Sequence, residues 1–150
     1  MKLNTFTDYS LRVLIYLAAE PGRRATIAEV ATAFDISENH LTKVVHFLGK
    51  QGWLANVRGK GGGMQLGMAA ETIVIGQVVR ATEGADLPAE CFGAEPDNCS
   101  IARICRLKRV LAEAVEAFHE VLDGYTLADL VHNRSAIARV LKIQPPVRNA

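Results

Sequence analysis

Two short helical segments followed by a glycine-rich hairpin constrain the fold of this chain more than any other feature. Thr26-x-x-Glu29 has the pattern of a capping box and predicts a helix over 26–34. After a tight turn, Ser37 is a good N-cap for a second helix over 37–48. Two short helices joined in this way are typical of a helix-turn-helix, in which the second helix reads DNA.

The hairpin that follows predicts a wing. Residues 53–58 and 64–67 are expected as two short strands around the turn Gly59-Lys60-Gly61-Gly62-Gly63. Glycines let the backbone approach phosphate closely, and an arginine on a narrow tip can enter the negative minor groove. We therefore predict that Arg58 and Lys60 contact duplex DNA.

The outward side chains at the start of the second helix would meet base edges in the major groove. Asn39 could read adenine, and Lys43 could bind guanine or phosphate. The same residues would also suit an ordinary solvated helix face, and the neighbouring wing favours the DNA interpretation. The predicted DNA-contacting residues of this helix are Ser37, Glu38, Asn39, His40, Thr42 and Lys43.

The remaining pattern is helical, so the predicted class is mainly α. Apolar spacing predicts a first helix over 7–20, and Thr72 is expected to cap a further helix through 82. A long helix over 101–122 has one apolar stripe, which requires a partner helix. A shorter helical segment is expected over 126–141.

These elements suggest a winged helix-turn-helix DNA-binding domain over 1–82, a loop over 83–100, and a dimerisation helix with a C-terminal segment over 101–150. The formal net charge is only +1, but the charges are segregated. Bases outnumber acids over 36–67, which suits phosphate, whereas 83–97 holds acids and no base. The longest apolar run is too short to span a bilayer, so we expect a cytoplasmic protein without a membrane segment.

The sequence holds three cysteines, Cys91, Cys99 and Cys105, in or just after the acidic loop. In a reducing compartment an odd number of thiols favours metal binding over disulfides. The spacing is too wide for a zinc ribbon and suits an iron–sulfur cluster, which would need a fourth oxygen or nitrogen ligand. Zinc and ordinary thiols remain alternatives. A thiol enzyme is disfavoured, because no Cys/His pairing of recognisable spacing is present.

Four segments together resemble the nitric-oxide-sensing repressors of the NsrR family. They are Phe6-Thr7-Asp8-Tyr9, the stretch from Val57 to Gly63, Cys105-Arg106-Leu107, and Tyr125-Thr126-Leu127-Ala128-Asp129-Leu130. The resemblance covers about residues 1–133. The related IscR regulators of cluster homeostasis have a histidine ligand three residues after the last cysteine. Lys108 stands at that position here, so an IscR-like regulator is the second choice.

The resemblance implies a homodimer that holds an iron–sulfur cluster, preferably four-iron (4Fe-4S) rather than two-iron (2Fe-2S). Its ligands would be the three cysteines and an aspartate that matches Asp8, donated by the other subunit. Taken alone, Asp8 is an acid of the first helical turn or part of a Thr5-x-x-Asp8 cap. Arg12 would hold Asp8, Glu83 or Asp129 by a charge-assisted bond, or form a routine surface pair.

These expectations combine into one mechanism. Long helices over 101–123 would pair two copies and set the separation of their recognition helices for a palindromic operator. The intact cluster would hold the DNA-binding geometry, and nitric oxide would release it. A redox- or zinc-dependent thiol regulator is the remaining alternative.

Overall fold

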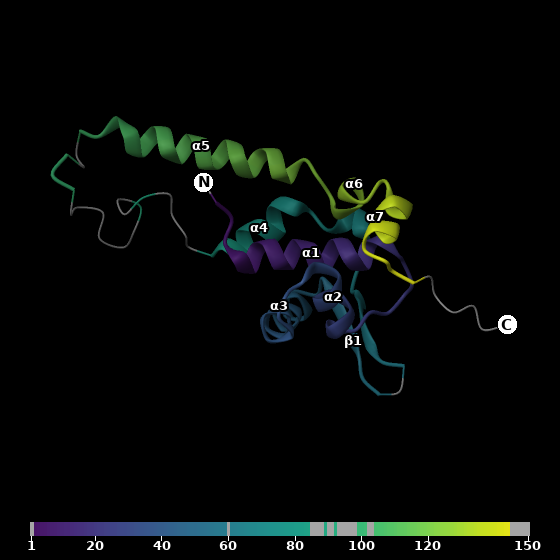
Figure 1. The fold of residues 1–150 in the computed structure, drawn as a ribbon. Coiled ribbons are helices and arrows are strands. Elements are labelled where there is room, and N and C mark those ends of the chain that lie inside the picture. Colours follow the sequence, from purple (N-terminus) through teal and green to yellow (C-terminus); the bar gives the residue numbers. More distant parts are fainter. Residues whose placement is uncertain are drawn as a thin grey trace.

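The computed structural model is a helical body from which a two-stranded wing and one long helix project in different directions (Figure 1). It describes residues 2–59, 61–84, 89, 92, 99–101 and 104–144. No helix in this part of the chain is both long and apolar enough to cross a lipid bilayer. The elements in chain order are α1 (Thr5–Ala19), α2 (Ile27–Phe34), α3 (Glu38–Lys50), β1 (Leu54–Val57), β2 (Gly63–Leu66), η1 (Ala70–Thr72), α4 (Ile75–Glu83), α5 (Arg106–Asp123), α6 (Leu127–Leu130) and α7 (Arg134–Val140).

The predicted helix-turn-helix is confirmed in α2 and α3. Both hydrogen bonds of the capping box between Thr26 and Glu29 are present at the start of α2. Asp35 ends that helix in the left-handed conformation, at φ 53°, and the chain then turns directly into α3. Ser37 occupies the N-cap position of α3 as predicted, but its side chain makes no capping hydrogen bond.

The wing forms from β1 and β2, which pair antiparallel with Leu54 opposite Leu66 and Val57 opposite Gly63. Each strand lies within one residue of its predicted position. Ala25 adds an isolated antiparallel bridge to Met64 on the outer edge of β2. The hairpin is therefore bound to the segment between α1 and α2, as well as to its own two strands.

The core lies around α1. Val13 and Leu14 have no exposed surface, and they pack in one cluster with buried residues of α3 and α4 such as Leu41 and Val78. Leu127 of α6 belongs to the same cluster, and its N–H donates to the carbonyl of Ile73 at 2.8 Å. The chain thus returns to the helical body after α5, and residues beyond position 101 complete its core.

Three predicted helix starts are wrong. The first helix begins at Thr5, because the Asn4 side chain accepts a hydrogen bond from the N–H of Thr7 and acts as the cap instead of Thr5. Thr72 lies in η1 and does not cap α4, which begins at Ile75 after an irregular turn. The long helix begins at Arg106, five residues after its predicted start at 101.

The C-terminal segment also differs from the prediction, because 126–141 forms two helices rather than one. Thr126 and Asp129 make a second complete capping box, which starts the single turn of α6. The chain then turns again, and α7 begins at Arg134. This capping box explains the Thr-x-x-Asp spacing in the segment that resembles the NsrR family.

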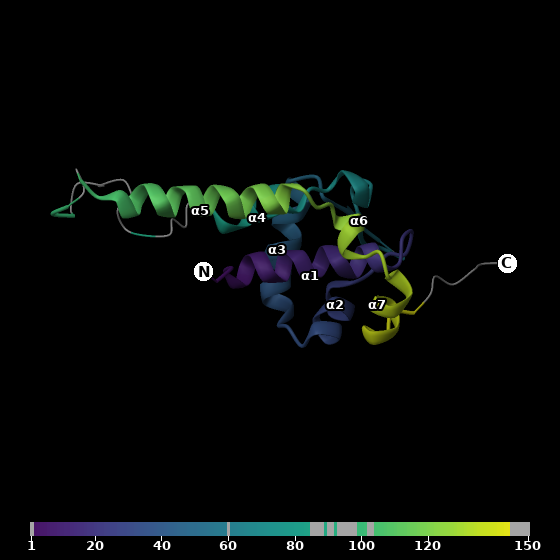
Figure 2. The same ribbon diagram turned by 90° about the horizontal axis from the view of Figure 1, so that it is seen from above.

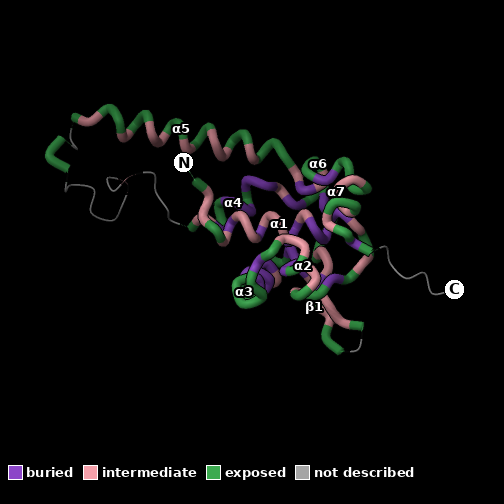
Figure 3. Tube along the Cα trace, viewed as in Figure 1, coloured by how far each residue is buried: buried purple, intermediate pink, exposed green. Residues whose placement is uncertain are grey.

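Helix α5 extends far beyond the body in both views (Figures 1 and 2). None of its residues is buried, and it is intermediate or exposed along its whole length (Figure 3). Its C-terminal end is anchored to the body, where Arg80 of α4 donates to Asp123 at 2.7 Å and makes a second, shorter bond. These bonds hold the pKa of Asp123 below its ordinary value. Gly76 lies under this pair, and a Cβ there would collide with the Asp123 carboxylate.

Candidate nucleic-acid interface and cysteine region

Helix α3 presents one buried face and one exposed polar face. Leu41, Val44, Val45 and Leu48 pack inward. The predicted DNA-contacting side chains lie on the opposite side, and all are exposed: Ser37, Glu38, Asn39, His40, Thr42 and Lys43. The Thr42 hydroxyl donates to the Glu38 carbonyl at 2.8 Å, which fixes its rotamer. This face therefore has the accessibility that base contacts in a major groove require.

A groove of about 340 Å³ joins the start of α1 to the exposed face of α3. The Tyr9 ring of α1 lies with its centroid 6.3 Å from that of His40. A second aromatic contact joins the same two helices, because the Phe6 ring packs edge-to-face on Phe47 with a centroid distance of 5.3 Å. The first two turns of α1 therefore rest directly on the candidate recognition helix. The sequence did not indicate this contact. Aromatic residues that recur on one face of a helix usually belong to the core, so nothing marked Phe6 and Tyr9 as neighbours of the recognition helix.

The tip of the wing is a glycine turn. Gly59 and Gly61 both have positive φ, at 95° and 76°, and the N–H of Gly62 donates to the Gly59 carbonyl at 2.8 Å. Arg58 is exposed at the end of β1, as a groove-inserting arginine requires. Lys60, the other predicted wing contact, lies outside the described residues.

Asp8 and Arg12 form a bidentate pair along α1. The Arg12 Nη2 atom lies 2.9 Å from Asp8 Oδ2, and Nε donates to Oδ1 at 3.1 Å. Both side chains stay partly accessible, and the Asp8 side chain is 45% exposed. The Arg12 guanidinium also lies 5.7 Å from the centre of the Phe34 ring, a cation–π contact that the sequence did not indicate.

The other acids considered for Arg12 have different partners. Glu83 accepts a hydrogen bond from the backbone N–H of Asn4 at 2.9 Å and ties the start of α1 to the end of α4. Asp129 accepts from Thr126 in the capping box of α6, which lowers the pKa of its carboxyl. Among the three predicted candidates, Asp8 is thus the acid that Arg12 contacts.

The cysteines that the structure describes lie before α5 and at its N-cap. Cys105 is the half-exposed N-cap residue of this helix, Cys99 is exposed, and both are free thiols, whereas Cys91 lies outside the described residues. No group of three or more ligand-type side chains comes together within the described ranges. Cys105, a soft thiol at a helix start with no acid in its first turn, has the donor chemistry that an iron–sulfur cluster requires. The Lys108 ammonium lies 5.7 Å from the centre of the Phe92 ring and so contacts an aromatic face.

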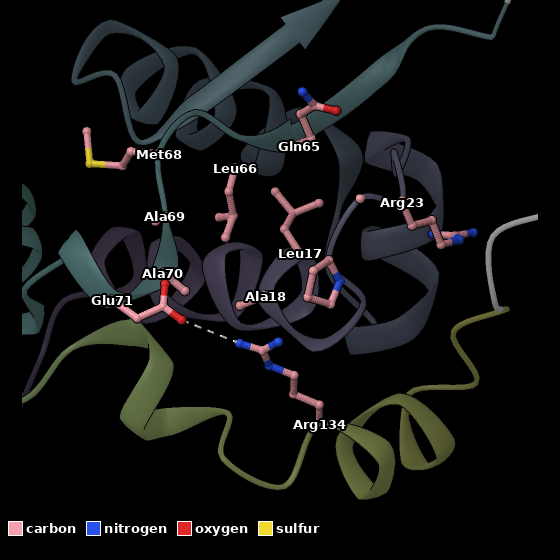
Figure 4. A pocket seen from close by; sticks show the side chains of 12 residues that line it. Leu17, Ala18, Arg23, Gln65, Leu66, Met68, Ala69, Ala70, Glu71 and Arg134 are labelled. Atoms are coloured by element: carbon pink, nitrogen blue, oxygen red, sulfur yellow. Dashed lines mark ion pairs between the residues drawn. The ribbon is translucent and has the colours of Figure 1, made fainter.

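A second cavity, of about 330 Å³, lies at the root of the wing (Figure 4). Leu17 and Ala18 of α1 form part of its apolar wall, and Leu66 of β2 faces them. Glu71 and Arg134 close one side with an ion pair whose N···O distance is 3.9 Å. The cavity therefore lies between the wing and α7, the last helix of the described chain.

Comparisons with known proteins place these features in a wider group. The profile of a family described as "Rrf2: Iron-dependent Transcriptional regulator" matches residues 3–133. The HTH-type transcriptional regulator NsrR of Bacillus subtilis is 51% identical over 145 residues, which cover 96% of this chain and 99% of that protein. The protein of the same name in Geobacillus kaustophilus is 46% identical over 143 residues, which cover 95% and 97%.

Solved structures give the same fold. IscR of T. potens aligns with a TM-score of 0.71 and 26% identity, covering 89% of this chain and 88% of that one. The oxidised form of CymR from Staphylococcus aureus aligns with a TM-score of 0.69 and 28% identity, covering 87% and 96%.

Proposed function

This chain belongs to the Rrf2 family of transcriptional regulators, and from this premise we propose that it is a nitric-oxide-responsive repressor that binds operator DNA as a homodimer. The observation that carries the proposal is the pairing, in one chain, of an exposed recognition face with free thiols that precede a long helix in which no residue is buried. The first part binds DNA, and the second receives the signal.

The homodimer is supported by the exposed apolar stripe of α5. Ile104, just before the helix, is 82% exposed, and Leu107 and Val110 are 61% and 54% exposed. Such a stripe loses contact with water when two copies of the helix pack together. Pairing through α5 would relate the two recognition helices by a two-fold axis, which fits a palindromic operator.

Cys91, Cys99 and Cys105 would hold an iron–sulfur cluster, with the partner's Asp8 as the fourth ligand. A ligand from the second copy is supported by the position of α5, which begins well beyond the start of α1 in both ribbon views (Figures 1 and 2). A partly exposed carboxylate that Arg12 holds in one orientation is suited to this role. Such a cluster, when bound, supplies iron with which nitric oxide reacts.

The contacts of α1 provide the route from the signal to the DNA. Asp8 lies between Phe6 and Tyr9, which pack on Phe47 and His40 of the recognition helix. A shift of the first turns of α1 would therefore move α3. Changing operator occupancy from near full to near empty needs a preference of ~3–5 kcal/mol for one geometry, which ligand bonds across a subunit boundary can supply.

The deciding experiment is an anaerobic purification followed by visible absorption, iron and sulfide content, and operator binding, each before and after nitric oxide. We expect a brown protein that bleaches and leaves the operator. A colourless, iron-free protein that binds zinc would contradict the cluster. DNA binding that follows cluster loading but ignores nitric oxide would favour an IscR-like regulator instead.

Cys99→Ala should uncouple DNA binding from nitric oxide, and Ser100→Ala is the matched control because that neighbouring residue is also exposed. The sensor mechanism is wrong if Cys99→Ala still binds the operator and is still released by nitric oxide.

Arg58→Ala tests the wing separately. We expect weaker binding on operators with A·T-rich minor grooves, and equal affinity of variant and parent there would remove the wing from the interface.

A further inference from the structure

The wing has a backbone bridge to the segment between α1 and α2 that the sequence did not indicate. The N–H of Ala25 donates to the Met64 carbonyl at 2.9 Å, and the N–H of Met64 donates back to the Ala25 carbonyl at 2.8 Å. Gly63 makes this approach possible, because a Cβ at its φ of +148° would lie 2.8 Å from the Ala25 carbonyl oxygen. The loop between α1 and α2 is therefore joined to the hairpin at the second residue of β2, close to the glycine turn.

Arg24, which precedes the bridging residue Ala25, extends the attachment to the tip. Its Nη1 atom donates to the carbonyl of Gly61 at 3.1 Å, across 37 positions of sequence. Gly61 is one of the positive-φ glycines of the turn, and glycine supplies no side chain that could pack and hold the tip. Arg24 thus gives this glycine turn a side-chain anchor on the body of the protein.

We propose that Arg24 is a positioning residue that fixes the wing tip so that Arg58 is presented to the minor groove. The proposal rests on the proposed DNA-binding function. A free hairpin of two four-residue strands would lose conformational entropy when it inserts into a groove. An anchor present before binding removes part of that cost, and the benefit appears as affinity for DNA.

A double-mutant cycle separates this role from a direct contact of Arg24 with phosphate. On an A·T-rich operator, we expect Arg58→Ala to weaken binding about tenfold, and Arg24→Gln to cause most of the same loss. Because both variants disable one tip, the double variant should be little weaker than Arg58→Ala. Losses that multiply would mean that Arg24 acts independently, and would overturn the proposal.

Hydrogen exchange tests the anchor without DNA. In Arg24→Gln, the N–H of Gly62 should exchange faster, because the turn that it closes is no longer held. The N–H of Met64 should be unaffected, since the backbone bridge to Ala25 remains. Arg139→Gln on α7 removes the same charge outside the wing, and should change neither exchange rate.

The outcomes distinguish the proposal from the function on which it rests. If the parent protein binds no operator, the DNA-binding function fails, and the exchange measurement still decides whether Arg24 anchors the tip. If the parent binds but Arg24→Gln matches it in affinity and in exchange at Gly62, the positioning role is overturned. Arg24→Lys should recover most of the affinity, because its ammonium can donate to the same carbonyl.

Discussion

Helices α1 and α5 have similar lengths and opposite surroundings. Eight of the 15 residues of α1 are buried, whereas none of the 18 residues of α5 is. Helix α1 is covered by α3, α4, α6 and α7 of its own chain, so its apolar residues are already removed from water. One chain therefore buries the apolar residues of the helical body but leaves those of the long helix in contact with water.

The largest expected effect is in the covered helix. Leu14→Ala would leave a cavity where a fully buried side chain stood, and should lower the free energy of unfolding by ~2–5 kcal/mol. Leu107→Ala, at a side chain 61% exposed, should change it by less than ~0.5 kcal/mol at protein concentrations where the chain is monomeric. Urea denaturation measures both free energies of unfolding. Equal losses would show that Leu14 and Leu107 contribute equally to the stability of the single chain.

The junction of α4 with α5 should show the next largest effect. Gly76→Ala would place a Cβ 2.9 Å from the backbone nitrogen of Asp123 and force the end of α5 away from Arg80. We expect a loss of about 1–3 kcal/mol in thermal or urea unfolding, which is typical of overpacking. Gln77→Ala, at an exposed position of the same helix, is the control, and a neutral Gly76→Ala would show that the junction is loose.

The exposed stripe should matter for association rather than for folding. Leu107→Glu should weaken the proposed dimer more than about tenfold, because an unpaired charge would enter an apolar contact. Arg109→Glu changes charge at another exposed site on the same helix and should have a smaller effect. Sedimentation over a range of concentrations gives the dissociation constants. An unchanged dimer in Leu107→Glu would place the interface elsewhere.

The smallest expected effect is on the pH dependence of unfolding, and it arises from Glu29 in the helical body. Burial opposes ionisation of Glu29, but hydrogen bonds from Thr26 and Arg23 outweigh it, so the pKa of Glu29 lies below its ordinary value of 4.5. A lowered pKa means that ionised Glu29 stabilises the fold above pH 4.5, and that this contribution is lost as the pH falls through the lowered pKa. Glu29→Gln should flatten the pH dependence of unfolding in that range, which urea denaturation at several pH values measures.

The fold was predictable where local patterns decide it. The capping box at Thr26 and the turn at Asp35 specify α2 and α3 within a few residues, and adjacent glycines mark the wing. Helix starts without such a signal were predicted at the wrong residue. Val74 occupies the N-cap position of α4 but makes no side-chain hydrogen bond, whereas Thr72 is a residue type that commonly caps helices. The start of α1 depends on Asn4, whose amide also donates to the Thr82 carbonyl at 3.1 Å, a partner 78 positions away.

The candidate site was predictable to a similar degree. The exposed face of α3 follows from helical periodicity, because Leu41, Val44 and Leu48 fix the buried side. The bidentate Asp8–Arg12 pair follows from i,i+4 spacing. The stacking of Arg12 on Phe34 does not, because the two residues lie on different helices whose crossing no local pattern specifies.

The sequence by itself determined the helix-turn-helix, the wing, and the presence of a long helix with one apolar stripe, because caps, glycines and periodicity act over a few residues. Tertiary structure decided which elements meet. It placed the start of α1 against α3, tied Arg24 to the wing tip, and returned Leu127 to the core beside Ile73. These contacts join distant segments, and their existence depends on how whole helices pack around α1 rather than on any short run of residues.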